Sequence, residues 1–230
     1  MDSGETQLIE AVLDAYRQGA FPMAEGRDAA RLGKPVRWYR PFERALLPIV
    51  PERLGLDTGI HFPRRLMRTF RKGPFRLTSD AAFDRVIHAC AEPRKETPSS
   101  STETWIDDRI IQAFNLLHKA GLAHSIEAWH EKDTGELDLV GGIYGLALGR
   151  VFCAESMFSR PERGGTDASK VCLVKLIQHC TQRGFIAIDT QFVNPHLEQF
   201  GVTEIETERY LDLLDEVADE HLSWDPFQTA

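Results

Sequence analysis

Apolar and polar residues follow two different periods along this chain, and together they predict a mixture of helices and strands. Apolar residues three and four positions apart predict helices, because this spacing places them on one helical face. Short apolar runs bounded by glycine or polar residues predict strands. The predicted helices are 5–18, 64–72, 81–91, 108–121 and 168–183. The predicted strands are 36–40, 45–49, 75–78, 123–129, 137–148, 151–154 and 185–191.

Proline, serine and threonine are concentrated in residues 94–103, which predicts a loop or hinge between two parts of the chain. After it, Asp133, Thr134 and Gly135 separate two strands and predict a β-hairpin. The following strand, helix and strand form a unit that usually makes a parallel crossover. Both strand ends of such a unit lie at the same edge of the sheet.

Three polar residues lie at those two strand ends and form a candidate site. Glu155 follows one apolar run, and Asp189 and Gln191 close the next. Because side chains alternate along a strand, Asp189 and Gln191 share one face and lie roughly 7 Å apart. We expect Glu155 to converge on them. The alternative is that all three are ordinary polar residues that meet solvent at the ends of strands.

Composition restricts the class of protein. Hydrophobic residues make up 42% and charged residues 27% of the 230 positions, and no apolar run is long enough to span a membrane. The acidic N-terminus lacks the features of a secretory signal. The four cysteines have no metal-binding spacing, which favours buried thiols in a reducing compartment. We therefore expect a cytoplasmic protein without a membrane partner.

The net charge of −8 is unevenly distributed. Residues 204–225 contain nine acids and one arginine, whereas residues 61–76 contain six basic residues and no acid. In the predicted helix, Arg64, Arg68, Arg71 and Lys72 fall on one face. Such a stripe binds nucleic-acid phosphates by counterion release. Taken alone, it is also compatible with a solvated helix face.

The order hairpin, strand, helix, strand also occurs in acetyltransferases, so an enzyme that uses acetyl-CoA must be considered. That class holds the pyrophosphate with a loop of the type Arg/Gln-x-x-Gly-x-Gly/Ala. Nowhere in this chain does an arginine or glutamine precede a glycine by three residues. The sequence therefore disfavours coenzyme A as a cofactor.

Nine short segments, spread over nearly the whole chain, carry a resemblance to one family. They are 16–23, 38–41, 104–106, 117–118, 123–129, 139–145, 155–160, 168–170 and 189–191. In these segments and their order, the chain resembles the leucyl/phenylalanyl-tRNA–protein transferases. The resemblance implies an α+β fold with a small N-terminal α/β domain, residues 1–95. It also implies an acetyltransferase-like (GNAT-like) C-terminal catalytic domain with a mixed sheet, residues 104–230.

The resemblance implies an aminoacyltransferase that moves Leu or Phe, and by the same pocket Met, from aminoacyl-tRNA to another protein. The acceptor is the α-amine of a protein that begins with Arg or Lys, and the product is a signal for degradation. The positions that match the apolar aminoacyl pocket are Ile143, Val151, Met157, Leu176 and Ile188. The positions that match tRNA contacts are Trp38, Trp105, Arg64, Arg65, Arg68, Arg71 and Lys72.

The chemistry of that reaction sets the expected roles at the site. An aminoacyl ester is already activated, so positioning, proton removal and oxyanion stabilisation suffice. We expect Asp189 to orient Gln191, Gln191 to contact the ester or the amine, and Glu155 to bind the cationic acceptor. We expect a monomer without metal or cofactor. The alternative is a non-catalytic protein of this fold that binds aminoacyl-tRNA or a degradation signal.

Overall fold

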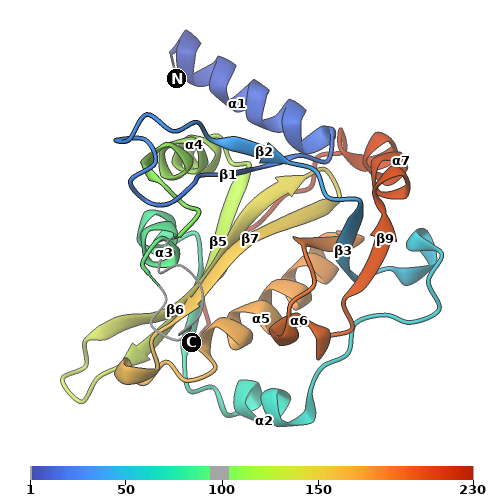
Figure 1. The fold of residues 1–230 in the computed structure, drawn as a ribbon. Coiled ribbons are helices and arrows are strands. Elements are labelled where there is room, and N and C mark those ends of the chain that lie inside the picture. The colour runs from blue at the N-terminus through green and yellow to red at the C-terminus, as the bar shows by residue number, and fades with distance from the viewer. Residues whose placement is uncertain (1, 94–103, 230) are drawn as a thin grey trace.

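The computed structural model describes residues 2–93 and 104–229, which form a mixed α+β structure (Figure 1). The helices are α1 (Ser3–Arg17), α2 (Arg64–Lys72), α3 (Phe83–Cys90), α4 (Asp108–Lys119), α5 (Ala168–Arg183), α6 (Pro195–Glu198) and α7 (Thr207–Val217). Two short 3-10 helices span Pro51–Leu54 and Pro161–Arg163. The predicted loop at 94–103 lies outside the described residues.

A seven-stranded mixed sheet forms the centre, in the order β4-β5-β6-β7-β8-β3-β9. Its strands are β3 (Glu43–Pro48), β4 (Arg76–Ser79), β5 (Ala123–Glu131), β6 (Leu137–Leu148), β7 (Val151–Ser159), β8 (Ala187–Gln191) and β9 (Thr203–Glu206). The strands β1 (Phe21–Met23) and β2 (Arg37–Tyr39) form a separate antiparallel pair. The predicted hairpin is confirmed, because β5 and β6 pair antiparallel around the predicted turn. The predicted crossover is also confirmed, because β7 and β8 pair in parallel.

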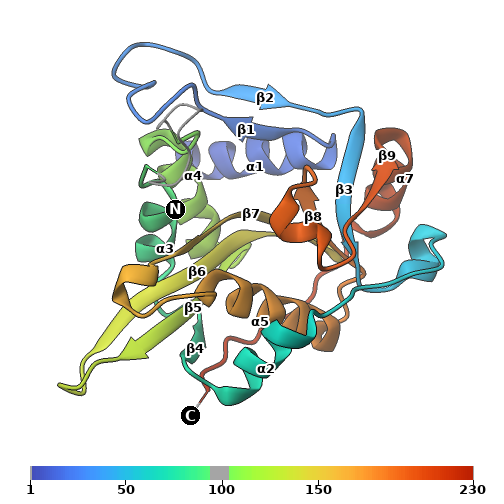
Figure 2. The ribbon, with the colours of Figure 1, turned by 60° about the horizontal axis from the view of Figure 1, so that its bottom comes forward.

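Helices cover both faces of the sheet, as the two views in Figures 1 and 2 show. The helices α1, α3, α4 and α7 contribute to one hydrophobic cluster, and α5 covers the other face with α2 packed beside it. The helix α5 has the bounds that the sequence predicts, and Gly184 ends it in a left-handed conformation, φ 89°. Gly141 lets the start of α5 approach β6, because a Cβ there would lie 2.5 Å from the Cβ of Ala168.

Strands from the first 95 residues belong to the same sheet as strands from the rest of the chain. The strand β3 pairs with β8 and β9, and β4 pairs with β5. Residues on both sides of the predicted boundary therefore build one sheet, and the division into an N-terminal and a catalytic domain stays a prediction. Within residues 2–93 and 104–229, no helix combines the length and the apolarity needed to cross a bilayer.

Candidate active site

The parallel pairing of β7 and β8 brings the three predicted polar residues together. Cys153 lies opposite Asp189 in the register, and the two strands then run on in the same direction to Glu155 and Gln191. Gln191 Nε2 donates a hydrogen bond of 3.2 Å to Glu155 Oε1. The predicted convergence of Glu155 with the end of β8 is therefore confirmed.

A β-bulge sets the direction of Glu155. Tyr144 of β6 pairs with Ser156, but the next residue, Gly145, pairs with Ala154, so Glu155 has no partner in the ladder. A bulge bends its strand and redirects the side chain of the extra residue. Here the Glu155 carboxylate points toward α1, where Tyr16 Oη donates a hydrogen bond of 2.8 Å to Oε1.

Asp189 is fully buried, and its carboxylate is surrounded by donors. Arg44 Nε lies 2.9 Å from each carboxylate oxygen, and Arg44 Nη2 lies 2.6 Å from Oδ2. Tyr210 Oη donates to Oδ2 at 2.8 Å. The backbone N–H of Gln191 donates to Oδ1 at 2.8 Å. Asp189 therefore contacts Gln191 through the main chain, whereas the Gln191 side chain is directed at Glu155.

Glu155 is in the opposite electrostatic situation. Burial raises its pKa from 4.5 to about 8. The Tyr16 hydrogen bond lowers the pKa by less than burial raises it, and the two smaller effects are Asp189, which raises it, and Arg44, which lowers it. Burial and then the Glu155 charge also raise the pKa of Tyr144, whose buried hydroxyl has no hydrogen-bond partner among the described residues. A carboxyl group with a pKa near 8 exchanges protons close to neutral pH, which suits general acid–base work.

Comparison with known proteins fixes the family of this site. The family model described as leucyl/phenylalanyl-tRNA protein transferase matches residues 54–215, and the model of that family's N-terminal domain matches residues 8–41. The chain belongs to this family. A leucyl/phenylalanyl-tRNA–protein transferase of Akkermansia muciniphila is 42% identical over 211 residues, which cover 92% of this chain and 96% of that protein.

One more relative and one solved structure are also similar to this chain. A protein of the same name from Paramagnetospirillum magneticum is 44% identical over 205 residues, covering 89% of this chain and 86% of its own. Among solved structures, the crystal structure of FemX aligns with 96% of this chain and 66% of its own, with 11% identity and a TM-score of 0.48. That likeness is too low to carry an argument.

Four of the five predicted aminoacyl-pocket residues lie on the α5 face of the sheet. Ile143, Leu176 and Ile188 are buried in one hydrophobic cluster, and partly buried Met157 packs against it. Val151 belongs to the other cluster, with Cys153 and Tyr210. Val151 shares its face of β7 with Cys153 and Glu155, and the bulge at Glu155 shifts the alternation by one residue, so that Met157 lies on the opposite face. The structure does not bring Val151 to the other four, and the pocket stays a prediction.

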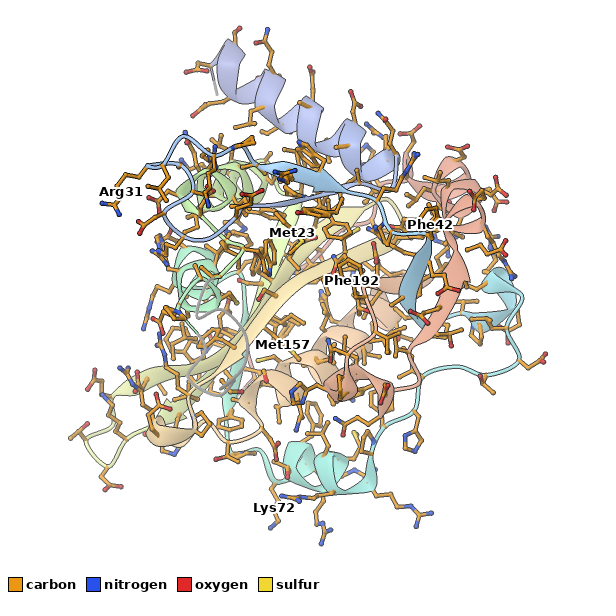
Figure 3. The ribbon with its side chains drawn as sticks, in the orientation of Figure 1. Met23, Arg31, Phe42, Lys72, Met157 and Phe192 are labelled. Carbon is orange, nitrogen blue, oxygen red and sulfur yellow. The ribbon has the colours of Figure 1, made fainter. Side chains whose placement is uncertain are left out.

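The two predicted tRNA tryptophans flank β1. Trp38 lies in β2 opposite Pro22 and is 45% exposed. Trp105 is partly buried, and its carbonyl accepts a hydrogen bond from the backbone of Ala24, just after β1. Beside them, exposed Phe192 follows Gln191 and packs edge-on against Phe21, with ring centroids 5.5 Å apart. Figure 3 shows Phe192 and Met157 near each other, in the region between β7 and α5.

The predicted basic helix is formed by α2, on the side of α5 that faces away from the sheet (Figure 2). Its five predicted tRNA residues are all exposed, and within residues 2–93 and 104–229 none forms an ion pair. They are Arg64, Arg65, Arg68, Arg71 and Lys72. Lys72 extends away from the body of the protein in Figure 3. Their role in binding tRNA stays a prediction.

Three residues of the site had no predicted role. Arg44 precedes an apolar run, and a charged residue there resembles the solvated start of a strand. Tyr16 lies at helical spacing from Ile9 and Val12 and is completely buried, but its partner Glu155 is distant in sequence. Tyr210 lies in the acidic segment, where only the charge was considered. Its spacing from Leu213, Leu214 and Val217 is helical, and this signal predicts the buried face of α7.

Proposed function

We propose that this protein transfers Leu, Phe or Met from aminoacyl-tRNA to the α-amine of proteins that begin with Arg or Lys. Transfer of an aminoacyl group is the activity of its family, and the finer choice of acceptor is our inference. The observation that carries the proposal is the contact between Gln191 and Glu155, with Asp189 fixed directly behind them. It provides an amide and a proton-exchanging carboxyl group side by side in a chain of this family.

The geometry supports a mechanism of positioning and proton exchange. The acceptor amine must lose a proton to attack the ester, and an α-amino group titrates at about 7.7–8.0. Glu155, with a pKa of about 8, matches it closely. Its Oε2 atom accepts no hydrogen bond among the described residues, which leaves it available to accept one from the acceptor amine. We assign the acceptor amine to Glu155, and the ester carbonyl to the amide of Gln191.

The aminoacyl side chain would enter between Met157 and the buried residues Ile143, Leu176 and Ile188. Met157 is the partly exposed member, and a flexible thioether side chain can move aside to admit different apolar groups. Such a pocket accepts Leu, Phe and Met, while a side chain branched at Cβ would crowd its walls. Val151 would pack on the opposite face of the sheet and hold β7 in place, without contacting the aminoacyl side chain.

We further propose that the terminal adenosine of the tRNA stacks on the aromatic side chains beside β1. Trp38 and Phe192 are exposed and Trp105 is partly buried, and Phe192 follows Gln191 directly. Bases stack on such rings. The positive charges of α2, which form no ion pair within residues 2–93 and 104–229, would hold phosphates of the acceptor stem by counterion release.

Three finer features belong to the same proposal. We infer that the sheet from β5 to β8 with α5 is a GNAT-like catalytic domain, to which an N-terminal domain contributes β3. We also infer that the protein acts as a monomer in the cytoplasm, where aminoacyl-tRNA is made. Four buried cysteines agree with a reducing compartment.

The test is transfer of labelled Leu, Phe or Met from tRNA to peptides that begin with Arg or Lys, with an Ala-initiated peptide as the negative control. We expect transfer to the first two peptides only. Gln191→Ala should abolish most transfer, and Gln112→Ala, an exposed glutamine on α4, should not. Binding of aminoacyl-tRNA without transfer would instead identify a non-catalytic binding protein.

A further inference from the structure

Arg44 is a buried arginine inside the first part of β3, and every direction around it is occupied. Its side chain is 1% exposed. Nη1 donates to the carbonyl of Gly19 at 2.9 Å, and the other two nitrogens contact Asp189. The guanidinium carbon lies 4.9 Å from the ring centre of Phe21 and 4.8 Å from that of Tyr210. The guanidinium plane is thus held in one orientation by its neighbours.

The ion pair fixes the direction of the Asp189 carboxylate. Removing one partner from a buried pair leaves an uncompensated charge, which is strongly unfavourable. The fork of a guanidinium also sets the angle of a carboxylate, whereas an ammonium group acts as a point charge. With both Oδ atoms bound by Arg44, Oδ1 remains directed at the backbone N–H of Gln191.

Gln191 needs this support because its backbone conformation is unusual. Its φ is 59°, in the left-handed region, which residues other than glycine adopt only at a cost. The hydrogen bond from its N–H to Asp189 holds this conformation. The conformation in turn directs Nε2 at Glu155.

We infer that Arg44 is a positioning residue for aminoacyl transfer, which acts through Asp189 to hold the backbone of Gln191 and thereby aim its side-chain amide. This inference rests on the proposed function, because it assigns Gln191 to the reacting ester. Arg44 itself touches neither substrate. A merely structural arginine would stabilise β3 without affecting the geometry of Gln191.

The first test compares Arg44→Lys with Arg109→Lys. Arg109 also binds a buried carboxylate through Nε and Nη2, at 2.9 and 2.7 Å from Asp107, but at the start of α4. We expect Arg44→Lys to lower kcat about 10- to 100-fold, since small misplacements of reacting groups can cost 100-fold. KM for aminoacyl-tRNA should stay within about twofold, because the binding surfaces are intact. Arg109→Lys should leave both parameters unchanged.

The second test measures the backbone of Gln191 directly and does not require activity. We expect hydrogen exchange of the Gln191 amide to become at least about tenfold faster in Arg44→Lys, while amides of α5 keep their rates. Unchanged exchange at Gln191, or an equal loss of kcat in Arg109→Lys, would overturn the inference. A wild-type protein without transfer activity would refute the proposed function, and the exchange rates would still decide whether Arg44 holds Gln191.

A neutralised pair covers the case in which Arg44→Lys does not fold. Arg44→Met combined with Asp189→Asn leaves no lone charge in the core, so we expect this double variant to fold. Its kcat should remain at least tenfold below that of the wild type, because the asparagine amide is no longer held by a guanidinium fork. A folded double variant with wild-type kcat would overturn the inference.

Discussion

The two carboxylates of the candidate active site, Asp189 and Glu155, lie on neighbouring strands and have opposite surroundings. Asp189 accepts hydrogen bonds from Arg44, Tyr210 and the backbone of Gln191. Glu155 accepts from Tyr16 and the Gln191 side chain, and no ion pair reaches it within the described residues. Burial raises the pKa of Glu155 to about 8.

This difference assigns two tasks, holding the geometry of the site and exchanging protons, to different carboxylates. The sequence alone does not distinguish them. A carboxylate enclosed by a guanidinium, a hydroxyl and an amide is suited to holding geometry, because each of its lone pairs is already engaged. A partly buried carboxyl group without a cation is suited to proton exchange, because neither of its protonation states is strongly preferred near neutral pH. Gln191 connects the two, with its backbone bound to Asp189 and its side chain bound to Glu155.

Removal of the Asp189 carboxylate should have the largest effect. In Asp189→Ala the buried Arg44 loses its counterion, so we expect a loss of about 3–5 kcal/mol in the free energy of unfolding. Transfer activity should fall below detection, because Gln191 also loses its backbone support. Urea denaturation and the transfer assay measure both effects. A variant as stable as the wild type would show that Arg44 can stay buried without a counterion. It would also contradict the proposal that Asp189 positions Gln191.

Much of the fold could be predicted from the sequence, because its elements carry local signals. The periodic apolar residues of α5 and the glycine after it give that helix its observed bounds. The hairpin of β5 and β6 follows from its turn residues. The strand β7 runs to Ser159, beyond the predicted end at 154. The prediction ends too early because the apolar run stops at the polar residues Glu155 and Ser156, where the strand is bulged. Alternation of apolar and polar residues does not describe such a segment.

The surroundings of the site could not be predicted, because they depend on contacts between distant segments. Glu155, Asp189 and Gln191 were found because a crossover places two strand ends together. Arg44 reaches Asp189 only because β3 inserts between β8 and β9, and no local pattern specifies that neighbour. Tyr16 and Glu155 are 139 residues apart. The difference between the two carboxylates therefore becomes visible only in the folded structure.

Neutralising Glu155 should affect catalysis more than folding. We expect Glu155→Gln to lower kcat about 100-fold, the lower end of the contribution of a general acid or base. The amide has the same shape and can still accept from Tyr16, so stability at neutral pH should not fall. The matched control is Glu127→Gln, since Glu127 is another buried carboxylate, bound by the hydroxyls of Ser125 and Thr78. Equal activity losses in both variants would contradict the special role of Glu155.

The raised pKa of Glu155 predicts a pH dependence of stability. In the unfolded chain Glu155 loses its proton above about 4.5, and in the folded protein it keeps the proton up to about 8. The folded state therefore binds more protons in this window, and the free energy of unfolding falls as the pH rises through it. The slope from this group is at most about 1.4 kcal/mol per pH unit.

Chemical denaturation at several pH values between about 5 and 8 measures this slope. Glu155→Gln should remove the contribution of Glu155 to the slope. Glu127→Gln serves again as the control for the loss of a buried carboxyl group. If the wild type and Glu155→Gln lose stability in parallel, then Glu155 is ionised in the folded protein and the comparison with Asp189 fails.

The smallest effect is expected for Tyr16→Phe, which removes one hydroxyl and keeps the ring. The hydrogen bond from Tyr16 lowers the pKa of Glu155, so its loss should raise that pKa further. If Glu155 accepts the proton of the acceptor amine, the rising limb of the pH–rate profile then moves to higher pH. At neutral pH we expect kcat to fall about tenfold, since the weaker hydrogen bonds to charged groups contribute about 1.5 kcal/mol. The rate should recover toward that of the wild type at alkaline pH. Tyr39→Phe, at an exposed tyrosine of β2, is the matched control. A rate that falls by the same factor at every pH would mean that Tyr16 only orients Glu155 and does not adjust its affinity for protons.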